Sequence, residues 1–448
     1  MLERAAEKEI NEWLRKPAGA LLVSGARQVG KTFTIRKCLR QTSASWLEIN
    51  LIEHPEIIPS LEQSRTVSEL LINLSTAFAF RFEPGKTVLF FDEIQEFSDI
   101  VTRIKFWVDD GRFRYILSGS LLGIELRGIR SAPVGYLRII EMYPLDFTEF
   151  LLGTGIPDEV IEHLQECYIR KEPVGNLIHE KIMTHFRRYL ITGGMPQAVE
   201  EYVASGDMRK VTEIQKGILA MHQLDFTRYE KMERRLNLIS VFTQVPSQLL
   251  KQNRRFSFAD LKKGLRYEKL ENSFLWLTCA GVVIPTYNTT EPKIALEQNA
   301  KHSLVKLYCA DVGLLTCQYG SAVRIGILQG ASKINLGGVF ENAVAQELNS
   351  HGYQTYFYHS HGKGELDFLI EQNGEVVPIE VKSGKDYYIH SALTKTLTNP
   401  EYNIRSAIVL ADCNISQVGN ITYYPVYMTT FIRDSQEYPK ANEIELRS

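Results

Sequence analysis

The residues that most directly indicate chemistry are those of residues 25–32, the run Gly-Ala-Arg-Gln-Val-Gly-Lys-Thr. Glycines at this spacing let the backbone turn its N–H groups toward phosphate oxygens, and a helix beginning there adds positive potential. We expect Lys31 to reach the β- and γ-phosphates of ATP, and Thr32 to ligate Mg²⁺. The predicted phosphate-binding residues are Gly25, Ala26, Arg27, Gln28, Val29, Gly30, Lys31 and Thr32.

A pair of carboxylates, Asp92 and Glu93, follows four consecutive apolar residues at positions 88–91. Such a run is typical of a buried parallel strand, and ligands bind at the carboxyl edge of a parallel sheet. We therefore expect Asp92 to hold Mg²⁺ through water, and Glu93 to orient or deprotonate the attacking water. Together with the run at residues 25–32, this pair predicts ATP hydrolysis.

Polar residues stand at the tip of a further strand, predicted at residues 113–117. A side chain there could sense the γ-phosphate from the strand beside the carboxylate pair. Ser118 and Ser120 are the candidates, and a simple turn is the alternative for either serine. Three arginines follow in a loop-rich stretch, where one could stabilise transition-state charge and a solvated side chain is the alternative for each: Arg127, Arg130 and Arg138.

A second group of candidate residues surrounds Asn-Gly at positions 373–374, the strongest short signal for a hairpin. A two-residue turn there places Asp367 opposite Glu380, and Glu365 opposite Lys382. All four side chains share one face, because side chains alternate with period two along a strand. The other face is apolar apart from the pair flanking the turn, which supports this register.

The polar face of this hairpin is unusual, because Asp367 and Glu380 are like charges with Cβ atoms roughly 5 Å apart. A divalent metal would remove the conflict, and two carboxylates with waters suit Mg²⁺. Lys382 would stabilise charge at a scissile phosphate or position water, and Glu341 lies on a helix predicted upstream. The alternatives are an ordinary charged solvent face, or a domain of this kind that binds without cutting.

Apolar patterning and chain breaks place the elements that must position these residues. Helices are predicted at residues 1–16, 33–40, 51–80, 236–250, 270–279 and 338–349, and strands at 20–23, 45–50, 281–285 and 355–358. Residues 151–235 are predicted to be mostly helical, a lid or linker interrupted at residues 192–196 by a double glycine and a proline.

The middle of the chain has the pattern of a winged-helix-type module, over residues 236 to about 325. Between residues 226 and 274, eleven Lys and Arg stand against five Asp and Glu. Such a local excess of positive charge could attract a phosphate backbone, which makes DNA a candidate partner. A rigid spacer or a protein contact is the alternative.

Overall composition indicates a folded, soluble protein of about three domains, with 448 residues, 44% hydrophobic and 23% charged. The net charge of −2 gives no global attraction to nucleic acid or anionic membrane. No stretch approaches the roughly 20 apolar residues of a membrane span. The six cysteines are scattered without a C-x-x-C pair, which predicts neither a zinc ribbon nor a disulfide framework and favours a cytoplasmic location.

Further short motifs run along the chain: Phe-Asp-Glu-Ile-Gln at 91–95, Tyr-Pro-Leu-Asp-Phe at 143–147, Gly-Gly-Met-Pro at 193–196, Tyr-Cys-Ala-Asp-Val-Gly-Leu-Leu at 308–315 and Phe-Glu-Asn at 340–342. With the run at residues 25–32, they resemble a widespread prokaryotic family of AAA+-type ATPases with an uncharacterised C-terminal half. Members often carry Gly-Arg shortly before Tyr-Pro-Leu. Here Gly135-Tyr136 stands there, with Arg138 two residues on, so the resemblance assigns no arginine finger.

The hairpin carboxylates carry a second resemblance. Asp367, Glu380 and Lys382, with Glu341 upstream, are similar to the PD-(D/E)XK nuclease core, although Leu366 stands where that motif has proline. This resemblance implies catalytic roles for these four residues and a metal at Asp367 and Glu380.

Together these features predict an α/β protein of four parts. They are an AAA+-like P-loop ATPase domain with a parallel sheet (1–150), a helical lid or linker (151–235), a winged-helix-like domain (236–330) and a PD-(D/E)XK-like domain (331–448). The predicted function is an ATPase coupled to a nuclease-like domain that binds or cleaves DNA. The alternative is a nucleotide-dependent switch or remodeller whose C-terminal domain is a non-cleaving docking surface. The sequence indicates no oligomeric state.

Overall fold

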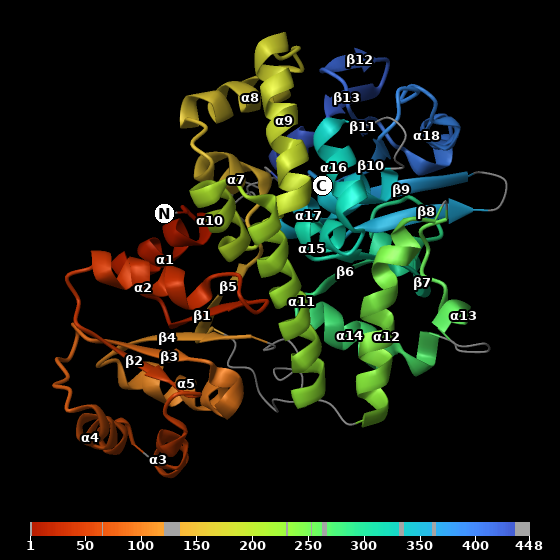
Figure 1. Ribbon diagram of the computed structural model, residues 1–448. Helices are drawn as coiled ribbons and strands as arrows, with labels where there is room; N and C mark the ends of the chain where they lie inside the picture. Colours follow the sequence, from red (N-terminus) through yellow and green to blue (C-terminus); the bar gives the residue numbers. More distant parts are fainter. Residues whose placement is uncertain are drawn as a thin grey trace, which may run out of the picture.

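A computed structural model describes residues 2–64, 66–120, 135–229, 232–251, 253–261, 267–330, 336–360 and 364–434. Its strands form two sheets, at the lower left and the upper right of Figure 1. The first sheet ends at Met142 and the second begins at Val283. The two predicted chemical sites therefore belong to different sheets.

The first sheet, among the described residues, contains five strands: β1 (Ala20–Gly25), β2 (Trp46–Asn50), β3 (Val88–Asp92), β4 (Arg114–Gly119) and β5 (Leu137–Met142). Their order is β2-β3-β4-β1-β5, and every adjacent pair is parallel. Strand β3 is buried along its whole length, because helices cover both faces of a parallel sheet. The carboxyl ends of β1, β3 and β4 thus meet at one edge, where the predicted ATP-binding residues lie.

Helices cover both faces of this sheet (Figure 1). One face is covered by α1 (Ala5–Arg15) and α2 (Lys31–Gln41), and the other by α3 (Ile58–Gln63), α4 (Val67–Phe78) and α5 (Ile100–Asp110). The helix predicted at residues 33–40 begins earlier, at Lys31, directly after the glycine-rich loop. The segment predicted as helical at residues 51–80 is divided, because Pro55 starts a 3₁₀ turn at Pro55–Ile57.

A helical segment follows: α7 (Phe147–Gly153), α8 (Asp158–Arg170), α9 (Asn176–Thr192), α10 (Pro196–Ser205) and α11 (Met208–Tyr229). The predicted break lies between α9 and α10. There the Gly194 N–H donates to Asp311 Oδ2 at 2.6 Å, and the Gly194 carbonyl accepts from the Leu145 N–H at 2.7 Å. The break therefore joins the exit of the first sheet to the C-terminal half.

The second sheet contains β6 (Val283–Thr289), β7 (Ala300–Cys309), β8 (Tyr356–Ser360), β9 (Gly364–Gln372), β10 (Glu375–Lys382), β11 (Ala407–Ala411), β12 (Ser416–Val418) and β13 (Ile421–Pro425). The order is β12-β13-β11-β10-β9-β8-β6-β7, with parallel and antiparallel pairs. Its accompanying helices are α12 (Met232–Leu249), α13 (Phe258–Leu261), α14 (Glu271–Cys279), α15 (Val312–Cys317), α16 (Ser321–Gln329), α17 (Gly337–Ser350) and α18 (Ser391–Leu397).

This sheet crosses residue 330, where we expected a domain boundary. The antiparallel pair β6–β7 lies before residue 330 in the sequence. On its other side, β6 pairs in parallel with β8, which lies after residue 330. A hydrophobic core also includes Leu2 and buried residues between Leu145 and Ile432, among them residues of α9, α12, α17 and β10. The helical segment and the C-terminal half therefore pack as one unit around this core.

The hairpin register follows the prediction. Gln372 pairs with Glu375, Ile370 with Val377, and Phe368 with Ile379. Asn373 and Gly374 have φ of 51° and 74°, as a two-residue turn with the twist of the flanking strands requires.

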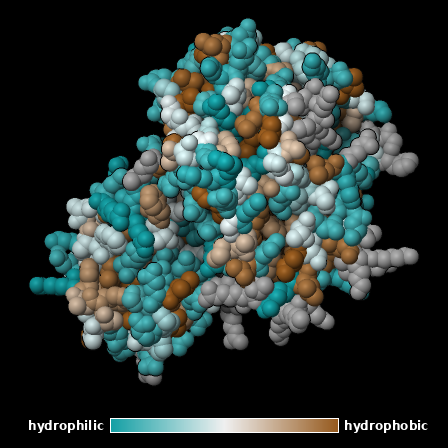
Figure 2. Space-filling view, viewed as in Figure 1, coloured by the Kyte–Doolittle hydropathy of each residue, from teal (hydrophilic) through white to brown (hydrophobic). Residues whose placement is uncertain are grey.

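On the face shown in Figure 2, apolar residues lie scattered among hydrophilic ones. Within the described ranges, none of the helices combines the length and the apolar composition needed to span a membrane.

Candidate functional site

The loop between β1 and α2 has the conformation of a phosphate cradle. Gly25 has φ of +145°, and a Cβ there would lie 2.1 Å from the Met142 carbonyl oxygen of β5, so only glycine fits. Gly30, with φ of +94°, immediately precedes α2. The helix therefore begins at Lys31 with backbone N–H groups directed at the loop, as anion binding requires.

Lys31 folds back over this loop. Its Nζ donates to the carbonyl oxygens of Gly25 and Ala26 at 2.9 and 2.8 Å, and the side chain is buried. Burial lowers the pKa of Lys31 to about 8, although the charges of Glu93 and Asp92 act in the opposite direction. An ammonium held by two carbonyls is a cation that an entering phosphate can bind.

Asp92 is held by hydroxyls on both sides. Its Oδ2 accepts from the Thr32 hydroxyl at 2.9 Å, and its Oδ1 accepts from the Ser118 hydroxyl. Burial raises the pKa of Asp92, while the Ser118 hydrogen bond opposes this shift. Thr32 and Asp92, the two predicted Mg²⁺ ligands, are thus adjacent. Ser120 lies nearby, but only its backbone N–H contacts this network, through Gln95 Oε1 at 3.2 Å.

Glu93 occupies the left-handed region, with φ of 56°. Its carboxylate accepts a hydrogen bond from the side-chain amide of Gln95, which is itself buried. Gln95 therefore connects the predicted catalytic carboxylate to Ser120 at the tip of β4. Gln95 is thus a positioning residue for Glu93 and Ser120. The sequence indicated it only as the last residue of the motif at 91–95.

Of the three arginines considered as transition-state stabilisers, the structure describes only Arg138. Arg138, on β5, has its Nη2 3.6 Å from Glu9 Oε2 and 3.5 Å from Glu12 Oε2, both on α1, the helix that covers one face of the first sheet. Arg127 and Arg130 fall outside the described residues. Arg4 instead supports the loop, with Nη1 donating to the Val29 carbonyl at 2.7 Å.

Two residues of the phosphate loop contact the other half of the molecule. Arg27 forms an ion pair with Asp225 of α11. Ala26 packs against Gly281, which has φ of +68° and whose Cβ, if present, would lie 2.9 Å from the Ala26 Cβ. A cavity of about 150 Å³ adjoins this contact, lined by residues that include Gly25, Tyr143, Thr278 and Gln346. The loop is therefore also part of an interface.

The four predicted residues of the second site converge on the C-terminal sheet. Glu341 projects from α17, Asp367 from β9, and Glu380 and Lys382 from β10. The Lys382 Nζ donates to Glu380 Oε1 at 2.7 Å. Asp367 Oδ2 accepts from the Val381 N–H at 2.9 Å. The carboxylates therefore share one polar centre, which we call the acidic cluster (Glu341, Glu365, Asp367 and Glu380).

Cations from the preceding segment occupy this cluster. Lys306 of β7 is fully buried, with Nζ 2.8 Å from Glu365, 3.7 Å from Asp367 and 3.9 Å from Glu341. Arg254 forms an ion pair with Glu341. The sequence could have indicated this pairing, because Lys306 is the only charged residue in the otherwise apolar run 304–308 and a buried charge requires a partner.

Burial controls the protonation of the cluster. It raises the pKa of Glu341 to about 7 and that of Glu380 to about 8, and the charge of Asp367 adds to both shifts. Oε2 of Glu380 is buried with no hydrogen-bond partner among the described residues. The oxygen donors match a divalent metal in type, but Lys306 now supplies the positive charge.

The local basic excess is also partly used internally. Arg254 pairs with Glu341, Arg255 lies 3.7 Å from Glu365, and Lys251 pairs with Asp260. These cations are therefore engaged by carboxylates of the same chain, which reduces the charge available to a phosphate backbone.

Comparisons with known proteins agree with the first site. Residues 18–151 match a family described as an AAA domain. Residues 183–323 and 336–427 match two families described as domains of unknown function, DUF8612 and DUF4143. No curated protein matches the sequence. The first sheet and its loop thus lie within the region that is similar to AAA domains.

Two solved structures are similar to part of the chain. One is the Walker-type ATPase PABY2304 of Pyrococcus abyssi, with 14% identity, a TM-score of 0.44, and coverage of 71% of this chain and 96% of that one. The other is Cdc6p from Pyrobaculum aerophilum, with 15% identity, a TM-score of 0.25, and coverage of 72% and 94%.

Proposed function

We propose that the chain is an ATP-driven switch, in which Mg·ATP at residues 25–32 controls how the C-terminal half docks on the ATPase domain. One observation carries this proposal: the phosphate loop is also a docking surface, through Ala26 on Gly281 and Arg27 on Asp225. A ligand that binds this loop changes those contacts to the extent that its affinity differs between the docked and the undocked form.

The residues around the loop fit ATP and Mg²⁺. Thr32 and Asp92 present adjacent oxygens, as a P-loop metal site requires. Bound Mg²⁺ would neutralise charge on the β- and γ-phosphates. Lys31 exchanges two carbonyls for phosphate oxygens, and Glu93, oriented by Gln95, holds the attacking water. Ser118 holds Asp92 from the neighbouring strand.

Lys31 also links the two events in this proposal. When its Nζ moves to phosphate, the Ala26 carbonyl loses its partner beside Gly281. We expect the contact between the loop and the C-terminal half to loosen as a result. ATPase assays test the premise: turnover should be lost in Lys31→Ala. If ATP binds to the full chain and leaves the exposure of Asp225 and Gly281 unchanged, the proposed switch is wrong.

A second candidate function is metal-dependent cleavage of DNA at Glu341, Asp367, Glu380 and Lys382. The convergence of these four side chains favours it, as does the succession of α12, α13, α14 and the β6–β7 pair, which is the order of a winged-helix DNA-binding module. Lys306 and Arg254 would then have to yield the cluster to metal. A cytoplasmic location belongs to the same proposal, and the six cysteines without a C-x-x-C pair support it.

Plasmid cleavage with Mg²⁺ or Mn²⁺ separates the two functions. A nuclease loses cleavage in Asp367→Ala and in Lys382→Ala. Equal cleavage by the wild type and both variants would remove the nuclease assignment and leave the switch intact.

A further inference from the structure

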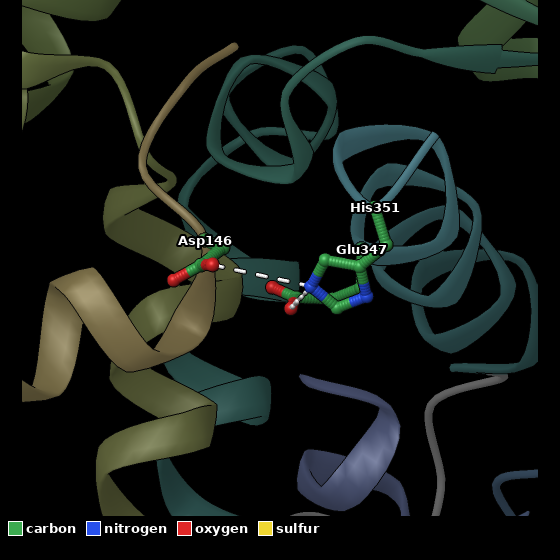
Figure 3. Close-up of side chains that lie close together, drawn as sticks. All are labelled: Asp146, Glu347 and His351. Carbon is green, nitrogen blue, oxygen red and sulfur yellow. Dashed lines mark ion pairs between the residues drawn. The ribbon is translucent and has the colours of Figure 1, made fainter. Parts of the chain in front are cut away.

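A second buried polar group lies where the ATPase domain meets the C-terminal half. Asp146 caps the N-terminus of α7, directly after the first sheet. Glu347 lies in the last turn of α17, and His351 is the C-cap of that helix (Figure 3). Their ligand-type atoms lie within 4.8 Å of one another, and this is the only such group of three His, Cys, Asp or Glu residues in the described part of the chain. We call it the junction triad.

His351 is oriented by the backbone. Its Nδ1 lies 2.9 Å from the Ile432 carbonyl oxygen, so Nδ1 carries the proton and donates it there. The other nitrogen, Nε2, then presents a lone pair toward the two carboxylates. Burial lowers the pKa of His351 to about 3, so this imidazole is neutral. Metal-ligating histidines characteristically donate their second nitrogen to a carbonyl in this way.

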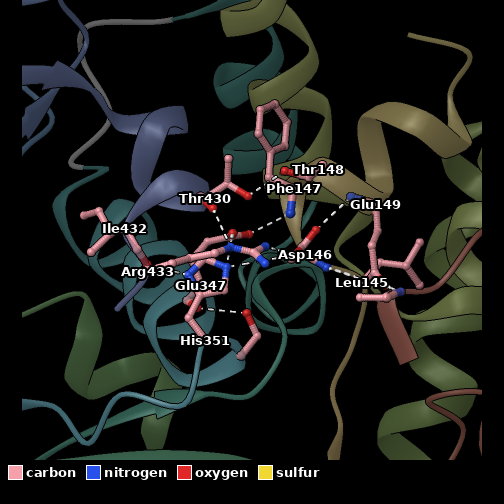
Figure 4. A network of polar contacts seen from close by, with 12 residues as sticks. Leu145, Asp146, Phe147, Thr148, Glu149, Glu347, His351, Thr430, Ile432 and Arg433 are labelled. Atoms are coloured by element: carbon pink, nitrogen blue, oxygen red, sulfur yellow. Dashed lines mark hydrogen bonds and ion pairs between the residues drawn. The ribbon is translucent and has the colours of Figure 1, made fainter. Parts of the chain in front are cut away.

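The two carboxylates are likewise fixed by one oxygen each (Figure 4). Glu347 Oε1 accepts from the Phe147 N–H at 2.7 Å, and Asp146 Oδ1 accepts from the Glu149 N–H at 2.7 Å. The second oxygen of each, Glu347 Oε2 and Asp146 Oδ2, faces His351. All three side chains are thus oriented toward one point by their outer hydrogen bonds.

At that point, two atoms have no partner. His351 Nε2 and Glu347 Oε2 are buried without a hydrogen-bond partner of good geometry within the described ranges, and their side chains are 3% and 2% exposed. The Thr430 side chain lies beside the Glu347 carboxylate and opposes the rise in its pKa that burial causes. Nε2 lies 3.9 Å from both Glu347 Oε2 and Asp146 Oδ2, which is too long for a hydrogen bond. Buried polar atoms are almost always satisfied, so the triad lacks a ligand.

The spacing and atom types identify that ligand. Two ligands on a tetrahedral zinc, each about 2.1 Å from it, are about 3.4 Å apart. The two distances from His351 Nε2, each 3.9 Å, would therefore have to shorten by about half an ångström to fit such an ion, and all three ligand atoms already lie within 4.8 Å of one another. A neutral imidazole beside carboxylates suits Zn²⁺ and its transition-metal neighbours, whereas Mg²⁺ and Ca²⁺ prefer oxygen alone.

We propose that Asp146, Glu347 and His351 bind a divalent transition metal of the zinc class. The ion joins the start of α7 to α17, and through the Ile432 carbonyl it also reaches the turn at Val426–Phe431. It is a structural site that fixes the C-terminal half to the exit of the ATPase domain, independent of both proposed activities.

Arg433 provides an internal check. Its Nη2 lies 3.2 Å from Asp146 Oδ2, and its side chain is 55% exposed, so it can swing away. In the metal-free chain this arginine stabilises the Asp146 charge and competes with a cation. Arg433→Ala should therefore raise metal affinity, an outcome that no purely structural role of the triad predicts.

The test titrates metal-stripped, full-length protein with Co²⁺ and then displaces it with Zn²⁺. We expect one tight ion per chain, with visible absorption from nitrogen and oxygen ligands and without a thiolate charge-transfer band. His351→Ala, Glu347→Gln and Asp146→Asn should each weaken binding by at least about 10-fold, the lower range for loss of an outer-shell partner. Glu347→Gln and Asp146→Asn keep their hydrogen-bond acceptors, so these two variants should fold.

His302→Ala is the matched control and should bind as the wild type does, because it removes a half-exposed histidine of β7 that lies outside the triad. Zn²⁺ should also raise the melting temperature of the wild type and leave that of His351→Ala unchanged. Equal Co²⁺ binding in all the triad variants, no binding in the wild type, or a zinc-soaked crystal with an ordered water only between the three side chains would each overturn the proposal.

Discussion

The ATP site and the acidic cluster both place carboxylates beside a buried lysine, but the lysines come from different parts of the fold. Lys31 lies six and five residues from Gly25 and Ala26, whose carbonyls it contacts, and Asp92 accepts hydrogen bonds from neutral hydroxyls. In the acidic cluster, Lys306 arrives from another strand and contacts three carboxylates directly. The first site keeps its cation for an incoming anion, whereas the second has already used it.

This difference separates a site prepared for a ligand from a site that is internally neutralised. A lysine on carbonyls gains when phosphate enters, because a full negative charge replaces two dipoles. A lysine buried among three carboxylates would have to leave before a metal could bind there. Similar residue types therefore stand in two different electrostatic environments.

Removing the cation of the acidic cluster should give the largest effect. Lys306→Met leaves Glu341, Asp367 and Glu365 without their shared charge, which should lower the free energy of unfolding by about 3–5 kcal/mol. Urea denaturation followed by circular dichroism measures this loss, with exposed Lys301→Met on the same strand as the control. A stable Lys306→Met protein that binds Mn²⁺ more tightly would instead show that the lysine occupies a metal site.

Removing the cation of the ATP site should affect catalysis and leave folding intact. Lys31→Ala should lower kcat for ATP by roughly 10²–10³-fold, the usual loss for one group that stabilises transition-state charge. Steady-state phosphate release measures it, and Arg40→Ala, an exposed cation on the same helix, should keep its activity. If Lys31→Ala unfolded the protein as Lys306→Met does, the contrast between the two sites would fail.

The ion pair between the two halves should have a smaller effect. Asp225→Asn removes the charge that faces Arg27, which is only partly buried, so we expect a loss of about 1 kcal/mol in the stability of the docked form. Proteolysis of the full chain should accelerate accordingly. The control is Asp207→Asn, whose partner Arg209 is exposed. Equal acceleration of proteolysis in both variants would show that the Arg27–Asp225 pair does not stabilise the interface.

Alkaline pH should give the mildest effect. The pKa of Lys31 is lowered to about 8, so its charge is present below that pH and lost above it. ATP prefers the charged form, and KM for ATP should rise severalfold between pH 7.5 and 9. Lys31→Arg should lack this rise, since a guanidinium stays protonated there. A flat profile in the wild type would mean that the carbonyls of Gly25 and Ala26 keep Lys31 charged.

Local patterns predicted most of what lies within one element or one turn. The residues 25–32 loop, strand β3 and the hairpin register at Asn373-Gly374 follow from spacing, apolar runs and turn chemistry. Contacts between distant segments were less accessible. The pairing of β6 with β8, and the approach of Lys306 to Asp367, depend on which sheet edges meet in the folded chain. No short sequence motif predicts such long-range contacts.

The same reasoning explains the arginines and the junction triad. Arg138 has the residue type of an arginine finger, yet its strand directs it to Glu9 and Glu12. Asp146 belongs to a motif noted in the sequence, whereas Glu347 belongs to none. The two residues are 201 positions apart and meet where the start of α7 contacts α17. The sequence therefore predicted neither the site nor the contact.

Hydrogen exchange at Asp225 and Gly281 tests the proposed switch most directly. The full-length Glu93→Gln protein, which should hold ATP without turnover, is measured with and without Mg·ATP, and Lys31→Ala serves as the nucleotide-blind control. The switch predicts severalfold faster exchange in the peptides containing Asp225 and Gly281 when Mg·ATP is bound, and no change in Lys31→Ala. Unchanged exchange in Glu93→Gln, with ATP binding demonstrated in the same sample, would contradict it.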